Sequence, residues 1–237
     1  MNERIRIFVG HFGSGKSEIA INEVISAANR DLTPTLVDLD VIKPYFRCRL
    51  VRETLADRGV RLIAPEGDRF WADLPIILPE IKGAIKDPTR FVYLDSGGDD
   101  TGARVLGSFS DVLQESGYEM SLLVNMRRPF TDGLDSLAQM VERIRGAARL
   151  TITDIISNTH LMGETTPAVV LDGYRLAVET ARMAGVPLVA VTVTKDLIAD
   201  LRQEDFECPV IAIRRIVMPP FAQSPERRTT GPLFVVN

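Results

Sequence analysis

Gly10-His11-Phe12-Gly13-Ser14-Gly15-Lys16-Ser17 is the stretch of sequence that decides the fold. It satisfies the pattern G-x-x-x-x-G-K-[ST], in which glycines let a loop wrap around a polyphosphate. Residues 5–9 form an apolar run that predicts a buried strand, and residues 18–28 predict a helix. In this strand–loop–helix context, backbone N–H groups and the helix N-terminus face phosphate oxygens. The sequence therefore predicts a P-loop that binds a nucleotide.

Individual residues of the loop have separate expected roles. We expect Lys16 to reach the β- and γ-phosphates and to take part in catalysis, and the Ser17 hydroxyl to ligate Mg²⁺. The other residues expected to contact the nucleotide are Gly10, His11, Phe12, Gly13, Ser14, Gly15 and Glu18.

Composition places the chain among globular proteins. It has 237 residues, of which 45% are hydrophobic and 25% charged, and its net charge of −4 weighs against a strongly basic nucleic-acid face. Its two cysteines, Cys48 and Cys208, lie far apart, which fits the cytoplasm better than a disulfide framework. Neither a signal peptide nor an apolar run of bilayer-spanning length is seen, so we expect a cytoplasmic protein without a membrane segment.

Short β-branched runs alternate with helical patterns along the whole chain. Helices are expected at 132–148, with Leu134, Leu137, Val141 and Ile144 on one apolar stripe, and between a Thr166 cap and Gly185. The expected strands are 5–9, 35–38, 60–63, 91–94, 120–124, 152–157, 187–193 and 209–213. This alternation predicts one doubly wound α/β domain over residues 1–237, with a mostly parallel sheet flanked by helices. The Pro-rich segment 217–221 is expected to run irregularly over the surface.

Carboxylates follow two of the expected strands. Asp38 and Asp40 come at the end of one strand, and Asp95 begins a D-x-x-G pattern that ends at Gly98. The carboxyl ends of parallel strands form the edge where open α/β sheets bind ligands. An acidic group there can support Mg²⁺ or orient an attacking water.

The P-loop, the Asp-x-Asp pair and the D-x-x-G pattern together resemble the MinD/ParA/CobQ class of deviant Walker-A P-loop ATPases, the SIMIBI class. The resemblance covers residue 4 to about residue 200. More narrowly, residues 10–16, 38–47 and 97–104 resemble a bacterial subgroup known for ATP binding alone. The class implies ATP and Mg²⁺ binding, slow hydrolysis to ADP and often a nucleotide-dependent dimer.

The resemblance also implies roles for single residues. Asp40 would position the attacking water, and the metal would be held by Ser17, Asp40 and Asp95. Asn158, at the end of a strand, matches the Asn of the class that contacts adenine.

His11 departs from the class, because dimerising members carry at this position a lysine that reaches the partner's nucleotide. Histidine is shorter and mostly neutral at pH 7. We therefore expect a weak ATP-dependent homodimer, in which Arg47, Arg49 or Arg104 supplies the positive charge. The alternative is that these three arginines are surface residues loosely paired with carboxylates.

Several other residues have a structural and a functional interpretation. His160 and Cys48 are read as structural rather than as catalytic or redox-active. Phe70-Trp71 fits a partner patch and a core anchor equally well. Lys195-Asp196 suggests a guanine-reading loop, but no Asn precedes the lysine, so adenine is the better expectation.

Two kinds of function fit these features. The first is an ATPase switch in which segments 40–49 and 96–104 respond to the nucleotide and alter the affinity for a protein partner. The second is an ATP-dependent enzyme that activates a small carboxylate substrate, as dethiobiotin synthetase does. Metal-centre maturation is a third possibility, weakened by the absence of a cysteine pair.

Overall fold

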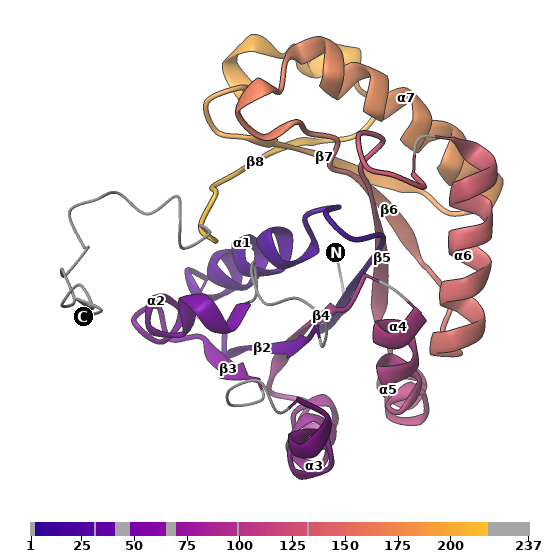
Figure 1. Cartoon of the computed structure of the whole chain (residues 1–237). Helices are drawn as coiled ribbons and strands as arrows, with labels where there is room; N and C mark the ends of the chain where they lie inside the picture. Colours follow the sequence, from indigo (N-terminus) through magenta and orange to yellow (C-terminus); the bar gives the residue numbers. More distant parts are fainter. Residues whose placement is uncertain are drawn as a thin grey trace, which may run out of the picture.

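The computed structural model describes residues 3–30, 32–40, 48–64, 70–98, 100–131 and 133–217 (Figure 1). Eight strands form one sheet in the order β3-β2-β4-β1-β5-β6-β7-β8, and all neighbouring strands pair in parallel. This confirms the predicted doubly wound α/β fold. The strands are β1 Ile5–Val9, β2 Pro34–Leu39, β3 Arg61–Ile63, β4 Phe91–Ser96, β5 Glu119–Val124, β6 Asp154–Ser157, β7 Leu188–Thr194 and β8 Val210–Ile213.

Helices follow most of the strands, as the parallel pairing requires. They are α1 Lys16–Ala28, α2 Arg52–Ala56, α3 Phe70–Lys86, α4 Asp100–Gly107, α5 Ser110–Ser116, α6 Leu134–Ala148 and α7 Pro167–Ala184. Short 3₁₀ turns lie at η1 Cys48–Val51, η2 Met162–Glu164, η3 Ile198–Asp200 and η4 Gln203–Asp205. No helix among these described residues is both long and apolar enough to cross a membrane.

The two faces of the sheet are covered by different helices (Figure 1). Ile7 and Val9 of β1 point into a core shared with α3, α4, α5, α6 and α7. Phe8, between them, packs on the opposite face in a second core that includes α1, η1 and α2. Burial on both faces explains why the strand sequences are apolar runs rather than alternating patterns.

Helix ends follow the local sequence signals. The Thr166 hydroxyl accepts a hydrogen bond from the Val169 amide, Pro167 occupies the first turn of α7, and Gly185 ends it with φ 68°. These three predictions are confirmed. In α6, Leu137, Val141 and Ile144 are buried as expected, but Leu134 at its first turn is exposed.

β1 occupies the position that matters for function. The chain first builds β2 and β3 on one side of β1, returns through β4 beside it, and then extends through β5 to β8 on the other side. The strand order therefore reverses at β1, and ligands of such sheets bind at the carboxyl ends of strands at this reversal. The P-loop begins there, one residue after β1 ends.

Candidate nucleotide-binding site

The P-loop is shaped by glycines with positive φ. Gly10 has φ 138° and Gly15 has φ 90°, conformations that side-chain-bearing residues rarely adopt. A Cβ on Gly10 would lie 2.5 Å from the Leu123 carbonyl oxygen, and one on Gly15 would lie 2.1 Å from the amide nitrogen of Asn158. Both positions thus require glycine for the turn and for close packing against the strand ends.

Lys16 is the first residue of α1 and lies almost entirely inside the protein. It is 2% exposed, and its ammonium donates hydrogen bonds of 3.0 Å to the carbonyl oxygens of both Gly10 and His11. The cation is therefore held across the loop, and Ser17 beside it is also buried. A fixed cation and a hydroxyl at a helix N-terminus form a site for phosphate oxygens.

Two asparagines hold consecutive P-loop carbonyls from outside the loop. Asn125 follows β5 and donates to the Gly13 carbonyl oxygen at 3.3 Å. Asn158 follows β6 and donates to the Ser14 carbonyl oxygen at 2.7 Å. The Thr192 hydroxyl of β7 donates to the Asn158 side-chain oxygen at 2.8 Å, which orients that amide. Three neighbouring strands therefore fix the loop before any nucleotide arrives.

Arg128 adds a second cation to the loop. Its Nε donates to the Gly13 carbonyl oxygen at 3.1 Å, and its side chain lies where a Cβ of Gly13 would be. The sequence analysis missed Asn125, Arg128 and Thr192. Asn125 has a sequence signal, because it directly follows β5 as Asn158 directly follows the neighbouring strand β6, whereas Arg128 has no such signal.

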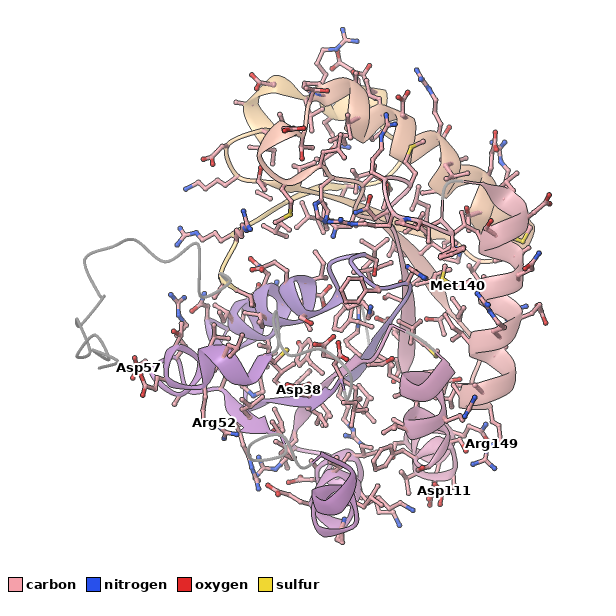
Figure 2. All side chains as sticks on the ribbon, viewed as in Figure 1. Asp38, Arg52, Asp57, Asp111, Met140 and Arg149 are labelled. Carbon is pink, nitrogen blue, oxygen red and sulfur yellow. The ribbon has the colours of Figure 1, made fainter. Side chains whose placement is uncertain are left out.

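The predicted carboxylates meet beside the P-loop. Asp38 and Asp95 are register partners in β2 and β4, and Asp95 is also paired with Phe8 of β1. The Asp40 amide donates to the Asp38 carboxylate at 3.1 Å, and all three carboxylates are buried. Figure 2 shows Asp38, a residue of β2, in the interior of the molecule.

Cys48 lies among these carboxylates. Its thiol donates to Oδ2 of Asp95 at 3.1 Å. Burial raises the pKa of Cys48 well above its usual value, and the charges of Asp95, Asp38 and Asp40 raise it further. The thiol is therefore protonated and serves as a hydrogen-bond donor, which agrees with the structural interpretation.

Gly98, the last residue of the D-x-x-G pattern, contacts the P-loop backbone. A Cβ at Gly98 would lie 2.7 Å from the Phe12 amide nitrogen. The pattern therefore ends against the phosphate loop.

The donor set fits a magnesium–nucleotide complex. Among the described residues no group of three or more His, Cys, Asp or Glu side chains is arranged to hold a metal alone. Mg²⁺ bound with a nucleotide does not need such a cage, because phosphate oxygens and waters supply most of its ligands. Among the described residues, the buried Ser17 hydroxyl and the Asp95 and Asp40 carboxylates are the groups that would hold such a metal.

A cavity of about 950 Å³ extends from the P-loop. At one end it is lined by Gly13, Lys16 and Ser17, and at the other by residues after β6, β7 and β8. The far end includes Met162, Lys195, Asp196 and the segment 213–217, apart from Ile216, whereas His160 lines the cavity near the loop, with its Nε2 3.9 Å from where a Cβ of Gly15 would lie. Its volume lies in the range of small-molecule and cofactor sites.

His160 lies in this cavity as a neutral imidazole. Burial lowers its pKa to about 4, and the positive charges of Arg128 and Arg215 act in the same direction. Its backbone amide donates to the Asn125 side chain at 3.3 Å. His160, which the sequence analysis interpreted as structural, thus also lines the cavity.

The other predicted residues take different positions. The rings of His11 and Phe130 are 5.7 Å apart, and Phe12 is 57% exposed at the cavity edge. Glu18 lines the cavity, but both its carboxylate oxygens accept backbone amides of residues 216 and 217. Arg104 is exposed on α4. Arg47 and the side chains of Arg49 and Phe70-Trp71 lie outside the described residues.

Comparisons with known proteins support the fold. No family model and no curated protein matches the chain. FtsY from Mycoplasma mycoides has a TM-score of 0.55 at 15% identity, over 82% of this chain and 62% of that one. Cell division protein FtsY from Thermotoga maritima has a TM-score of 0.57 at 17% identity, over 81% of this chain and 62% of the Thermotoga chain. Signal recognition particle receptor FtsY from Elizabethkingia anophelis, in complex with GDP, has a TM-score of 0.56 at 15% identity. The match covers 82% of this chain and 58% of the Elizabethkingia chain.

The chain thus spans about three fifths of the length of these structures. Identities this low show a shared fold and leave activity to be argued from the site. The comparisons therefore show that the chain has the fold of P-loop NTPases.

Proposed function

We propose that this protein is an ATP-binding P-loop switch that hydrolyses ATP slowly with Mg²⁺, as the MinD/ParA-like proteins it resembles do. The observation that carries the proposal is the buried Lys16 ammonium, held by two loop carbonyls at the end of a cavity of about 950 Å³. A buried cation at a helix N-terminus is suited to the polyphosphate of a nucleotide.

The residues around the loop have distinct roles in the proposed hydrolysis. Lys16 and the loop amides offset the phosphate charge, and Asp40 orients the water that attacks the γ-phosphorus. As the new P–O bond forms, the bond to the bridging oxygen breaks, and the proton of the water ends on the released phosphate. Mg²⁺, held through Ser17 and Asp95, would neutralise charge on the β- and γ-oxygens.

The far end of the cavity favours adenine over guanine. A guanine-reading site needs a carboxylate that accepts hydrogen bonds from the base. Among the described cavity residues the acidic side chains are Glu18 and Asp196. Glu18 is engaged by two backbone amides, and Asp196 is exposed at the rim after β7. Asp196 and the GDP bound to the FtsY structure that shares this fold are the observations that support GTP as the competing substrate.

Titration of the protein with Mg-ATP and Mg-GTP tests this choice. We expect tighter binding of Mg-ATP, with the same preference in Asp196→Ala and in Asp200→Ala, a matched exposed acid outside the cavity. Tighter binding of Mg-GTP, weakened about tenfold or more in Asp196→Ala alone, would assign the site to guanine nucleotides.

Phosphate release separates the switch from a metabolic enzyme. A switch should release phosphate from ATP with no second substrate, at a rate that a protein partner changes. Turnover that occurs only after a small carboxylic acid is added would instead identify an enzyme that activates that acid by phosphoryl transfer.

A further inference from the structure

The segment 214–217, called here the strap, crosses from the end of β8 back to α1. In Figure 1 the yellow chain after β8 runs to the side of α1. β8 lies at the edge of the sheet, four strands away from β1. The strap therefore joins the far edge of the sheet to the helix that carries Lys16 and Ser17.

Two side chains of α1 hold the strap through its backbone. The Asn22 amide donates to the Arg214 carbonyl oxygen at 2.8 Å, and the Arg214 amide donates to the Asn22 side-chain oxygen at 2.8 Å. One oxygen of Glu18 accepts from the Ile216 amide at 2.5 Å, and the other accepts from the Val217 amide at 3.2 Å. Glu18 and Asn22 are one helical turn apart, so they face the strap together.

Apolar packing supports these hydrogen bonds. Val217 is buried in the core that α1 shares with its face of the sheet, and Ile216 packs against the same core. The expected surface course from residue 217 is therefore wrong at Val217 itself, and residues 218–221 lie outside the described residues.

The strap also lines the nucleotide cavity. Arg214, Arg215 and Val217 are among its lining residues, opposite the loop after β7. Burial raises the pKa of Glu18, and the charge of Arg215 opposes this effect; burial lowers the pKa of His160, and the charges of Arg128 and Arg215 lower it further. The strap is thus a wall of the cavity that is held against the first two turns of α1.

We infer that the strap forms the nucleoside-binding wall of the site, and that Glu18 and Asn22 are positioning residues that fasten this wall to the P-loop helix. The inference rests on the proposed nucleotide function and adds how the base and ribose are enclosed. Glu18 directly follows Ser17, so one turn of α1 aligns the phosphate end and the nucleoside end of the cavity.

Binding of two probes tests the inference. Mg-ATP has a nucleoside, whereas Mg-tripolyphosphate carries only the phosphate chain. In both Glu18→Gln and Asn22→Ala, we expect the dissociation constant for Mg-ATP to rise about tenfold and that for Mg-tripolyphosphate to change less than twofold. Hydrogen exchange at Ile216 and Val217 should accelerate in Glu18→Gln and should slow on Mg-ATP binding in the unaltered protein. Glu53→Gln, an exposed acid on α2, is the matched control.

Each outcome has one meaning. Selective loss of Mg-ATP binding in both variants supports the strap as the nucleoside wall. No change in either variant, or equal weakening of both probes, overturns it, because these residues would then be neutral or would act through the P-loop. If the unaltered protein binds neither probe, the proposed nucleotide function fails, which is a distinguishable result.

Discussion

At the scale of single residues, the site is organised by groups that hold the P-loop in place before a nucleotide binds. Asn125, Asn158 and Arg128 hold the carbonyls of Gly13 and Ser14 from outside. The loop backbone is therefore already fixed, and little ordering entropy remains to be lost on binding. We regard this preorganisation as the main contribution of the scaffold to the site.

Asp40 should affect turnover more than binding. Asp40→Ala is expected to keep Mg-ATP affinity within several-fold, because Lys16 and Ser17 hold the phosphates, and to lower hydrolysis about a hundredfold, the effect of a lost positioning group. Single-turnover phosphate release and equilibrium titration measure the two effects separately. Wild-type turnover in Asp40→Ala would show that Asp38 or another acid positions the water. Loss of turnover in Asp38→Ala would then assign this role to Asp38.

His160 should make stability depend on pH. Its pKa of about 4 in the folded protein lies below the ordinary 6.5, so between these values the unfolded chain binds the proton more readily. The free energy of unfolding should therefore fall as pH drops through this window, by about 2 kcal/mol between pH 7 and pH 5. Urea unfolding of the unaltered protein and of His160→Gln at pH 7 and pH 5 checks this. The free energy of unfolding of the variant should fall by about 2 kcal/mol less between these pH values. Equal decreases in both proteins would show that other groups cause it.

At the scale of elements, the sequence predicted the strands well because each is an apolar, β-branched run buried on both faces. All eight predicted strands form, and the P-loop and Asp95 lie where the strand order predicts them. Helices α2 and α5, whose N-cap residues Val51 and Phe109 make no side-chain cap hydrogen bond, were not predicted, and neither were α3 and α4.

The site was predictable only where a local motif defines it. Lys16, Ser17 and Asp95 belong to such motifs. Arg128 and the strap reach the cavity through contacts with residues more than a hundred positions away, which no local pattern records. Glu18 shows the limit most clearly, because the motif predicts a nucleotide contact for it and does not record that its carboxylate binds the strap.

A buried ion cluster should stabilise the joint between β1, β5 and α1. Arg6, whose side chain is 5% exposed, donates to Glu119 of β5 at 2.7 Å and to Glu23 of α1 at 3.5 Å. Arg6→Ala should lower the free energy of unfolding by about 3 kcal/mol, because both acids lose their buried partner. Arg61→Ala, which removes the exposed pair with Glu80, should cost less than about 1 kcal/mol. Chemical denaturation of both variants gives the comparison, and equal costs would contradict the buried-cluster account.

At the scale of the whole molecule, two aromatic side chains are exposed at or near the P-loop, where a partner could approach the nucleotide. Phe12, which lines the cavity, is 57% exposed, and Phe130, whose ring lies 5.7 Å from that of His11, is 68% exposed. Because His11 stands where the dimerising MinD/ParA-like proteins that this sequence resembles carry a lysine, we expect a weak homodimer that forms only with ATP.

Light scattering of Asp40→Ala, which retains bound ATP, tests this assembly. We expect a rise in mass with Mg-ATP at high protein concentration and a monomer with Mg-ADP. A monomer in both states would remove the homodimer and leave a protein partner or a small substrate as the trigger of turnover.

The central claim is that the P-loop cavity binds a nucleotide through Lys16, and thermal unfolding with and without Mg-ATP tests it most directly. Mg-ATP at a hundredfold excess over its dissociation constant should stabilise the protein by about 3 kcal/mol. Lys16→Ala should abolish this effect, whereas Lys86→Ala, an exposed lysine at the end of α3, should retain it. Full stabilisation of Lys16→Ala by Mg-ATP would contradict the assignment of this cavity as the nucleotide site.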